Sequence, residues 1–305
     1  MGMLSQIAAD KYPRTAFSSF TPEPGFTLGN AIAMAWMSQL AYEATDAHNP
    51  NGIVAAIGQK FGLLQASAFA QTFSSKLPLM SVRGVIAVGP TAIVVAFAGT
   101  EPLTPGDYIT DFEAKMNPDD VHHGFEAAVD AAWAPDIKPA LEAAAGKALF
   151  LTGHSMGGTL AFIAAARAAS KQINVTAVYT IGAARPGGAK FADAYPLGDK
   201  TFRLVYGNDM VSALPPMFPL GYRHVGRMLF CPRGSRFAEV ALSPAGEDNR
   251  RFDKALLAPL GDWFEDLTRH YPLRSRVIEL LFRTLPPGIA DHVPDSYLKA
   301  LGQAE

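Results

Sequence analysis

A serine between two glycines stands where an apolar run gives way to a helical one. The segment Gly153-His154-Ser155-Met156-Gly157 follows the strand-like residues 148–152 and leads into the Ala- and Leu-rich run Met156–Ser170. In this context G-x-S-x-G is typical of a nucleophile elbow, a strained turn that lifts a serine hydroxyl clear of a sheet. An ordinary glycine-rich turn is the alternative, although a phosphate-binding turn has a different pattern. We therefore expect Ser155 to be a nucleophile.

A serine in such an elbow needs a base and an acid, and both follow it in the chain. Asp209 comes after the predicted strand Thr201–Tyr206, through Gly207-Asn208. This is the edge of the sheet where the acid is expected, although an ordinary Asn-Asp turn is the alternative. The sequence therefore predicts Asp209 as the acid.

Three histidines beyond Asp209 are candidates for the base. His224 precedes the predicted strand Arg227–Cys231 and so lies at its wrong end, while His270 lies within a helical segment beside Arg269. His292 lies in a loop near the end of the sequence, just before a short predicted helix over 294–301. Such a loop can reach over the site, so topology favours His292 as the base and leaves His224 as the alternative.

The same elbow predicts an oxyanion hole. The backbone N–H of Met156 is the first donor, because it opens the helix that follows Ser155. The second is expected after an earlier strand, and the run 91–98 ends in Gly99-Thr100. Thr100 offers both its N–H and its hydroxyl, unless Gly99-Thr100 is only a turn that ends the strand. Loss of one such donor typically costs about 3–4 kcal/mol of transition-state stabilisation.

The elements that must hold these residues are strands alternating with helices. Apolar runs that predict strands lie at 82–88, 91–98, 148–152, Val175–Ile181, Thr201–Tyr206 and Arg227–Cys231, and helical runs at 27–42, 124–144 and Met156–Ser170. Gly89-Pro90 indicates that the first two strands form a hairpin. The alternation predicts an α/β fold with a mainly parallel central sheet flanked by helices.

The remaining segments are expected to belong to one domain, 1–305. Residues 1–25 predict an N-terminal arm, and 45–78 predict short helices. Residues 252–282 predict a C-terminal helical excursion with an apolar stripe. We favour packing of this stripe on the core, and a cap over the site is the alternative.

Composition excludes several classes of function. With 49% hydrophobic and 18% charged residues and a net charge of -2, the chain does not have the composition of a disordered protein. It is also not basic enough to favour binding to nucleic acid.

Its single cysteine, Cys231, allows no intrachain disulfide and is expected to be a buried small hydrophobe. No run predicts a membrane span, and the absence of a secretory signal leads us to expect a cytoplasmic location. His122-His123 lacks metal-ligand spacing, so no metal or other cofactor is expected.

Seven ordered motifs resemble the fungal-type triacylglycerol lipase family, class 3, of the α/β-hydrolase fold. The chain has a counterpart of each family pattern, in the same order. They are F-R-G-T/S at 97–100, D-W-x-x-D at 107–111, V-H-x-G-F at 121–125, G-H-S-x-G-G at 153–158, G-x-P-R-x-G at 182–187, N-D-x-V-x-x-L-P-P at 208–216 and D-H-x-x-x-Y at 291–297. The chain departs from them at Ala98, Tyr108 and Ala184, where the family has Arg, Trp and Pro, and Tyr297 comes one place late.

This resemblance implies roles for the residues that match. Ser155, Asp209 and His292 would form the triad, and Thr100 and Met156 the oxyanion pair. The family's lid would correspond to residues 101–110. A family counterpart of the motif at His224 is structural rather than catalytic, which agrees with the choice of His292 from topology.

The substrate is expected to be a lipid or another carboxylic ester. The loop after Asp209 is apolar and could line an acyl pocket. Its candidate lining residues are Met210, Val211, Leu214, Met217 and Phe218. Triacylglycerol lipase, phospholipase A1 and short-chain esterase all remain open, as do an acyltransferase and a non-catalytic lipid-binding module on the same fold. Transient contact with a lipid surface is expected for a lipase, and the oligomeric state is left open.

Overall fold

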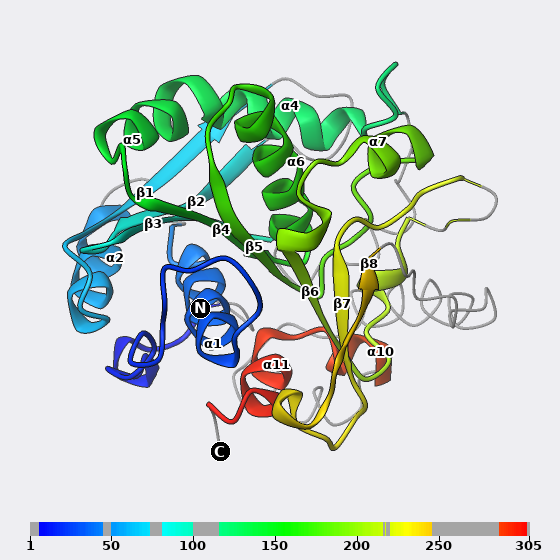
Figure 1. The fold of residues 1–305 in the computed structure, drawn as a ribbon. Coiled ribbons are helices and arrows are strands. Elements are labelled where there is room, and N and C mark those ends of the chain that lie inside the picture. Colours follow the sequence, from blue (N-terminus) through cyan, green and yellow to red (C-terminus); the bar gives the residue numbers. More distant parts are fainter. Residues whose placement is uncertain are drawn as a thin grey trace, which may run out of the picture.

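The computed structural model describes residues 6–44, 50–73, 81–99, 116–215, 217, 220–245 and 287–303. Within these ranges the strands form one eight-stranded sheet whose spatial order follows the sequence, from β1 to β8 (Figure 1). The strands are β1 (Gln65–Thr72), β2 (Ser81–Val88), β3 (Ala92–Phe97), β4 (Ala148–His154), β5 (Val175–Ile181), β6 (Thr201–Tyr206), β7 (Arg227–Cys231) and β8 (Leu242–Ala245). Strands β3 to β7 run parallel, and the outer pairs β1–β2, β2–β3 and β7–β8 are antiparallel. The predicted mainly parallel sheet is confirmed.

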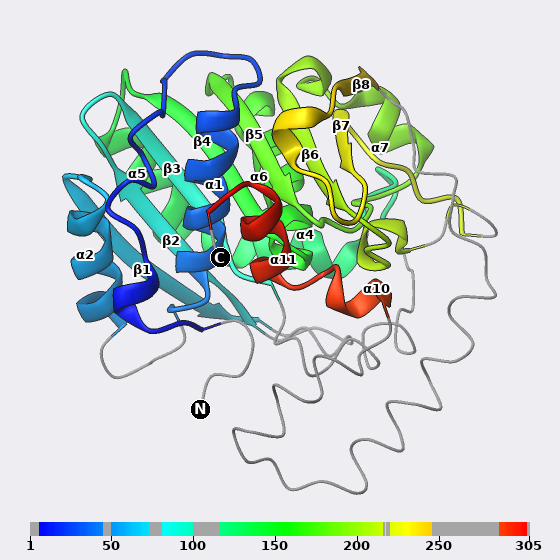
Figure 2. The same cartoon turned by 90° about the horizontal axis from the view of Figure 1, so that it is seen from below.

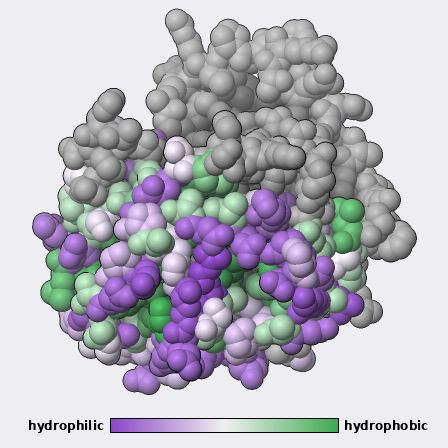
Figure 3. All heavy atoms as spheres, turned by 90° about the horizontal axis from the view of Figure 1, so that it is seen from above, coloured by the Kyte–Doolittle hydropathy of each residue, from purple (hydrophilic) through white to green (hydrophobic). Residues whose placement is uncertain are grey.

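Helices cover both faces of this sheet (Figures 1 and 2). On one face lie α4 (His123–Ala132), α5 (Lys138–Ala143), α6 (Met156–Ser170) and α7 (Ala189–Ala194). On the other lie α1 (Leu28–Ala41), α2 (Pro50–Lys60) and α11 (Pro294–Ala300). Seen from the side of α4 to α7, the outer surface is mostly hydrophilic with scattered hydrophobic residues (Figure 3). Such a surface is expected of helices that turn their apolar faces toward a sheet.

Each face of the sheet has its own hydrophobic core. All six residues of β3 and all seven of β5 are buried, as continuous apolar runs in a central parallel strand require. The cluster on one face includes Met34 and Trp36 of α1, and the cluster on the other includes Leu160 and Phe162 of α6. Strand β4, which ends directly before Ser155, contributes Phe150 to the first cluster and Leu151 to the second, so it is packed from both sides.

The segment 45–78 differs from its prediction. Helix α2 was expected, but residues Gln65–Thr72 form β1 and pair with β2 along their whole length. The sequence of β1, QASAFAQT, has few β-branched or aromatic residues, so its strand conformation depends on pairing with β2 rather than on local propensity. Strand β8, at the opposite edge of the sheet, was also not predicted.

Other predicted elements agree with the structure. The run 124–144 forms α4, a π-helical segment over Trp133–Ile137 that contains Pro135, and α5. The described part of the N-terminal arm packs on the body of the protein, because Tyr12 is fully buried and its hydroxyl donates to Glu43 Oε1 at 2.9 Å. The lid counterpart 101–110 and the excursion 252–282 lie outside the described residues. No helix in the described ranges is both long and apolar enough to span a membrane.

Candidate active site

Ser155 occupies a strained turn between β4 and α6. Its backbone has φ 59° and ψ -132°, a combination that residues other than glycine rarely adopt. The flanking glycines are required by close contacts. A Cβ on Gly153 would lie 2.2 Å from the carbonyl carbon of Gly157, and a Cβ on Gly157 would lie 2.2 Å from the carbonyl oxygen of Phe97. The turn has the geometry that the G-x-S-x-G pattern predicted.

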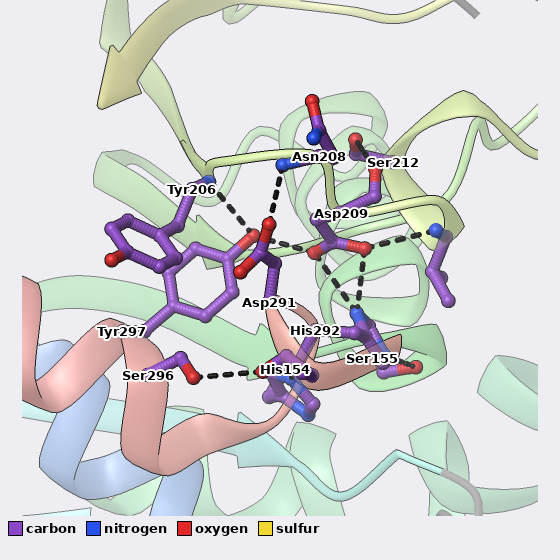
Figure 4. Close-up of polar contacts among 12 residues, drawn as sticks. His154, Ser155, Tyr206, Asn208, Asp209, Ser212, Asp291, His292, Ser296 and Tyr297 are labelled. Carbon is purple, nitrogen blue, oxygen red and sulfur yellow. Dashed lines mark hydrogen bonds and ion pairs between the residues drawn. The ribbon is translucent and has the colours of Figure 1, made fainter. Parts of the chain in front are cut away.

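The side chains of Ser155, His292 and Asp209 form one continuous chain of hydrogen bonds (Figure 4). Ser155 Oγ lies 2.9 Å from His292 Nε2, and His292 Nδ1 lies 2.9 Å from both carboxylate oxygens of Asp209. A carboxylate only accepts, so Nδ1 carries the proton and Nε2 is left to accept from the serine hydroxyl. All three side chains are buried, Asp209 completely.

Two further donors hold the carboxylate of Asp209. The backbone N–H of Val211 donates to Oδ1 at 2.9 Å, and the hydroxyl of Tyr297 donates to Oδ2 at 2.5 Å. Burial first, and then the charge of Asp209, raise the pKa of Tyr297 well above its ordinary value, so the phenol keeps its proton. Tyr297 lies in α11, so the last described helix contacts the acid directly. The sequence pattern had included Tyr297 without assigning it a role.

Asp291 joins the loops that carry the acid and the base. Its carboxylate accepts from the backbone N–H of Asn208 at 2.7 Å and from Arg233 Nε at 2.9 Å. A Cβ on Gly207 would lie 2.3 Å from Asp291 Oδ2, and Gly207 has a φ of 55°. Asp291, the residue before His292, is therefore hydrogen-bonded to Asn208, the residue before Asp209. The sequence motif at 291–297 includes Asp291 and gives it no role.

The alternative histidines have other contacts. His224 is buried, and its Nε2 donates to the carbonyl of Ser212 at 2.6 Å. His122 is the N-cap of α4, and its Nδ1 accepts from the backbone N–H of Phe125 at 3.3 Å. Burial, and secondarily the neighbouring His123, lower the pKa of His122 to about 4. His270 lies outside the described residues. Of the two candidate bases that the structure describes, His224 and His292, only His292 is hydrogen-bonded to Ser155.

Only part of the predicted oxyanion hole lies within the described residues. Met156 is the first residue of α6, and the first N–H groups of a helix have no acceptor within it. Gly99 lies beside the nucleophile, because a Cβ on it would be 3.0 Å from Ser155 Cβ. Thr100 lies outside the described residues, so its donor role remains a prediction.

The predicted acyl-pocket residues do not share one environment. Met210 and Leu214 are buried, and Met210 packs against Gly288 of α10 (Pro287–Ala290). Val211 is half-buried and Met217 is exposed, while Phe218 lies outside the described residues. A cavity of about 480 Å³ exists elsewhere, at the amino ends of β3 and β4, and none of the four described residues of this set lines it. Their role in substrate binding stays a prediction.

The chain is similar to known lipases in sequence and in fold. The sequence profile "Lipase (class 3)" matches residues 94–218, which include Ser155 and Asp209 but not His292. The structure is similar to lipase II from Rhizopus niveus, at 19% identity and a TM-score of 0.59 over 77% of this chain and 92% of that one. It is also similar to a mono- and diacylglycerol lipase from Aspergillus oryzae, at 19% identity and a TM-score of 0.59 over 74% and 88%.

A third similar structure is a triacylglycerol lipase whose catalytic centre is described as a serine protease triad. It shares 19% identity and a TM-score of 0.58, over 75% of this chain and 89% of that one. At these identities the structural likeness establishes the fold. The ordered motifs, the family profile over residues 94–218 and the fold agree: the chain has the α/β-hydrolase fold of these structures and is similar to class 3 lipases.

Proposed function

We propose that this protein hydrolyses carboxylic esters of lipids through an acyl-enzyme on Ser155. One observation carries the proposal: the uninterrupted hydrogen-bonded chain from Ser155 Oγ through His292 to Asp209, with Ser155 held in the elbow. A serine hydroxyl is a poor nucleophile unless a positioned base removes its proton. The lipase-type family match supplies the class of reaction, ester hydrolysis.

The mechanism follows from the positions of the protons. His292 Nε2 takes the Ser155 proton as Oγ attacks the ester carbonyl, and Asp209 stabilises the imidazolium that forms. The Met156 N–H, with Thr100 as the proposed second donor, holds the oxyanion. His292 then protonates the leaving alcohol. Water attacks the acyl-enzyme with His292 as base, and the carboxylic acid leaves.

Within ester hydrolases we propose neutral acylglycerols as the substrates. The similar structures include a triacylglycerol lipase and a mono- and diacylglycerol lipase, which supports this choice over phospholipids and short-chain esters. The apolar loop that follows Asp209, with Met217 exposed, supports transient contact with a lipid surface. Phospholipase A1 and short-chain esterase activity are the alternatives that the assay must separate.

The test is hydrolysis of p-nitrophenyl esters from acetyl to palmitoyl, followed by titration of acid released from emulsified triacylglycerol and from phosphatidylcholine. Ser155→Ala is the inactive variant, and Ser170→Ala is the matched control because Ser170 is an exposed serine at the far end of α6. We expect Ser170→Ala to match the wild type and Ser155→Ala to lose at least about 10⁴-fold in kcat. Activity limited to short chains would reduce the assignment to an esterase. No activity at any length would favour the lipid-binding module.

A further inference from the structure

His154 is a buried histidine that the proposed mechanism does not use. It is the last residue of β4 and directly precedes Ser155. Its Nδ1 lies 2.6 Å from the hydroxyl of Tyr42, which follows α1, and its Nε2 lies 2.6 Å from the backbone carbonyl of His292. The imidazole therefore connects the nucleophile's strand, the first long helix and the backbone of the base. Figure 4 shows His154 directly beside His292 and Ser155.

The partners of His154 determine where its protons lie. The carbonyl of His292 can only accept, so Nε2 must carry a proton. Burial first, and then the nearby His292, lower the pKa of His154 well below its ordinary value, so the ring is neutral. A neutral ring has one proton, which leaves Nδ1 to accept from the Tyr42 hydroxyl. The His292 carbonyl thus fixes the tautomer of His154, and the Tyr42 hydroxyl supports that tautomer by donating to Nδ1.

The neutral state of His154 suits a position beside the base. The ring centroids of His154 and His292 are 4.6 Å apart, at an angle of 31° between their planes. In the described part of the chain, the other ionisable groups facing this pair are Tyr42, Tyr297 and Asp209. The ring centroid of Tyr297 is 6.2 Å from that of His154, and Asp209 is bonded to His292. A second imidazolium at this distance would oppose the positive charge that His292 gains during catalysis.

Tyr42 also borders the nucleophile. A Cβ on Gly99 would lie 2.4 Å from the Tyr42 hydroxyl, 2.8 Å from the His154 carbonyl and 3.0 Å from Ser155 Cβ. The Tyr42 hydroxyl therefore packs against the residue that precedes the proposed oxyanion donor Thr100. One buried hydrogen-bonded pair contacts the segment of the oxyanion hole on one side and the backbone of the base on the other.

We infer that Tyr42 and His154 are positioning residues: their hydrogen-bonded pair fixes the His292 backbone, and so the reach of Nε2 to Ser155. The inference rests on the proposed function of Ser155 and His292. Neither side chain is expected to exchange a proton with substrate. Displacement of a catalytic group by about 1 Å can cost about 100-fold in rate, so loss of the anchor is expected to lower kcat strongly.

Two substitutions separate the two hydrogen bonds of His154. In His154→Gln the amide nitrogen lies near the position of Nε2 and can still donate to the His292 carbonyl. In His154→Asn the side chain reaches only the position of Nδ1, so the bond to Tyr42 is kept and the bond to His292 is lost. Each variant buries an amide and loses one bond, so their melting temperatures should fall similarly. A purely structural role would therefore not separate their activities.

The experiment measures kcat and KM for a p-nitrophenyl ester, and the rate at which diethyl p-nitrophenyl phosphate labels Ser155, by mass spectrometry. We expect His154→Asn to lose about 10- to 100-fold in kcat and in labelling rate with little change in KM, and His154→Gln to retain at least about ten times the kcat of His154→Asn. Tyr42→Phe, which keeps the ring, should lose about 3- to 10-fold in kcat.

These measurements distinguish failure of the positioning role from failure of the proposed function. A wild-type protein that neither turns over ester nor is labelled at Ser155 would overturn the proposed function itself. Equal kcat values for folded His154→Asn and His154→Gln in an active protein would overturn the role of His154. Full kcat in Tyr42→Phe would overturn the role of Tyr42, and this variant remains informative if both His154 variants fail to fold.

Discussion

The hydroxyl of Tyr297 donates to the carboxylate of Asp209 across 2.5 Å, and the same hydroxyl accepts from the backbone N–H of Tyr206 at 3.1 Å. Asp209 is therefore hydrogen-bonded to α11, the last described helix, as well as to His292. A carboxylate that accepts from several donors keeps its orientation while the base rotates or becomes charged. This contact makes α11 part of the site, although no residue of α11 is expected to touch the ester.

Removal of that hydroxyl should reduce turnover more than stability. Tyr297→Phe keeps the ring that stacks on Phe237 but loses the bond to Asp209, so we expect kcat to fall about 10-fold and the free energy of unfolding to fall by about 1–2 kcal/mol. Tyr195→Phe is the matched control, because its buried hydroxyl bonds to Thr201 Oγ1 at 3.0 Å. It should lose similar stability and no kcat. Equal kcat in the two variants would contradict the role given to Tyr297.

The elbow should tolerate no side chain at Gly157. In Gly157→Ala the new Cβ meets the backbone of Phe97 and Ala98, which cannot move as a flexible side chain would. We expect a loss of about 2–3 kcal/mol in the free energy of unfolding, with kcat reduced because Ser155 shifts. Gly198→Ala is the control, since no atom lies within 4 Å of its Cβ position, and it should change stability by less than about 0.5 kcal/mol. Urea unfolding of both variants measures this, and equal midpoints would refute the prediction.

Asp291 should be needed to hold the base loop against the acid loop. Asp291→Ala leaves the Asn208 N–H and the Arg233 guanidinium without this partner, so we expect a loss of about 1–3 kcal/mol in stability and about 10-fold in kcat. Asp295→Ala removes a carboxylate four residues later that pairs with Lys299 on the surface at 2.7 Å. That control should lose less than about 0.5 kcal/mol and no activity. Indistinguishable kcat values in the two variants would show that Asp291 does not position His292.

His122 should make stability depend on pH. Burial lowers its pKa from the ordinary 6.5 to about 4 in the folded protein, so its protonation favours unfolding. The stability it contributes is complete above pH 6.5 and is lost as the pH falls to about 4, by up to about 3 kcal/mol. Asn can replace the N-cap acceptor without titrating, so His122→Asn should lose less stability than the wild type between pH 7 and pH 4. Urea unfolding at pH 7, 5.5 and 4 checks this, and parallel losses would contradict it.

The parts of the fold that could be predicted from sequence are those that local patterns determine. The buried strands β3 to β7 appear as continuous apolar runs, and the Ser155 elbow appears as glycines between a strand and a helix. Asp209 and His292 could be chosen because the order of elements limits where an acid and a base can lie. These inferences needed no contact between distant residues.

The parts that could not be predicted depend on contacts between distant segments. Strand β1 depends on its pairing with β2, and the anchor from His154 to the His292 carbonyl spans 138 positions in the sequence. Local spacing cannot show that the residue next to a nucleophile accepts from a tyrosine at the end of α1. Buried polar side chains with two partners in different segments are found only once the segments are packed together.

The serine and its base also become available at different times during synthesis. Ser155 lies between the fourth strand and α6, whereas His292 follows every strand of the described sheet and reaches the site from α10 and α11. A growing chain can therefore complete its sheet on the ribosome while the serine still has no base. Ester cleavage must wait until the segment that carries His292 emerges and docks, so catalytic competence reports that this segment has been made and packed.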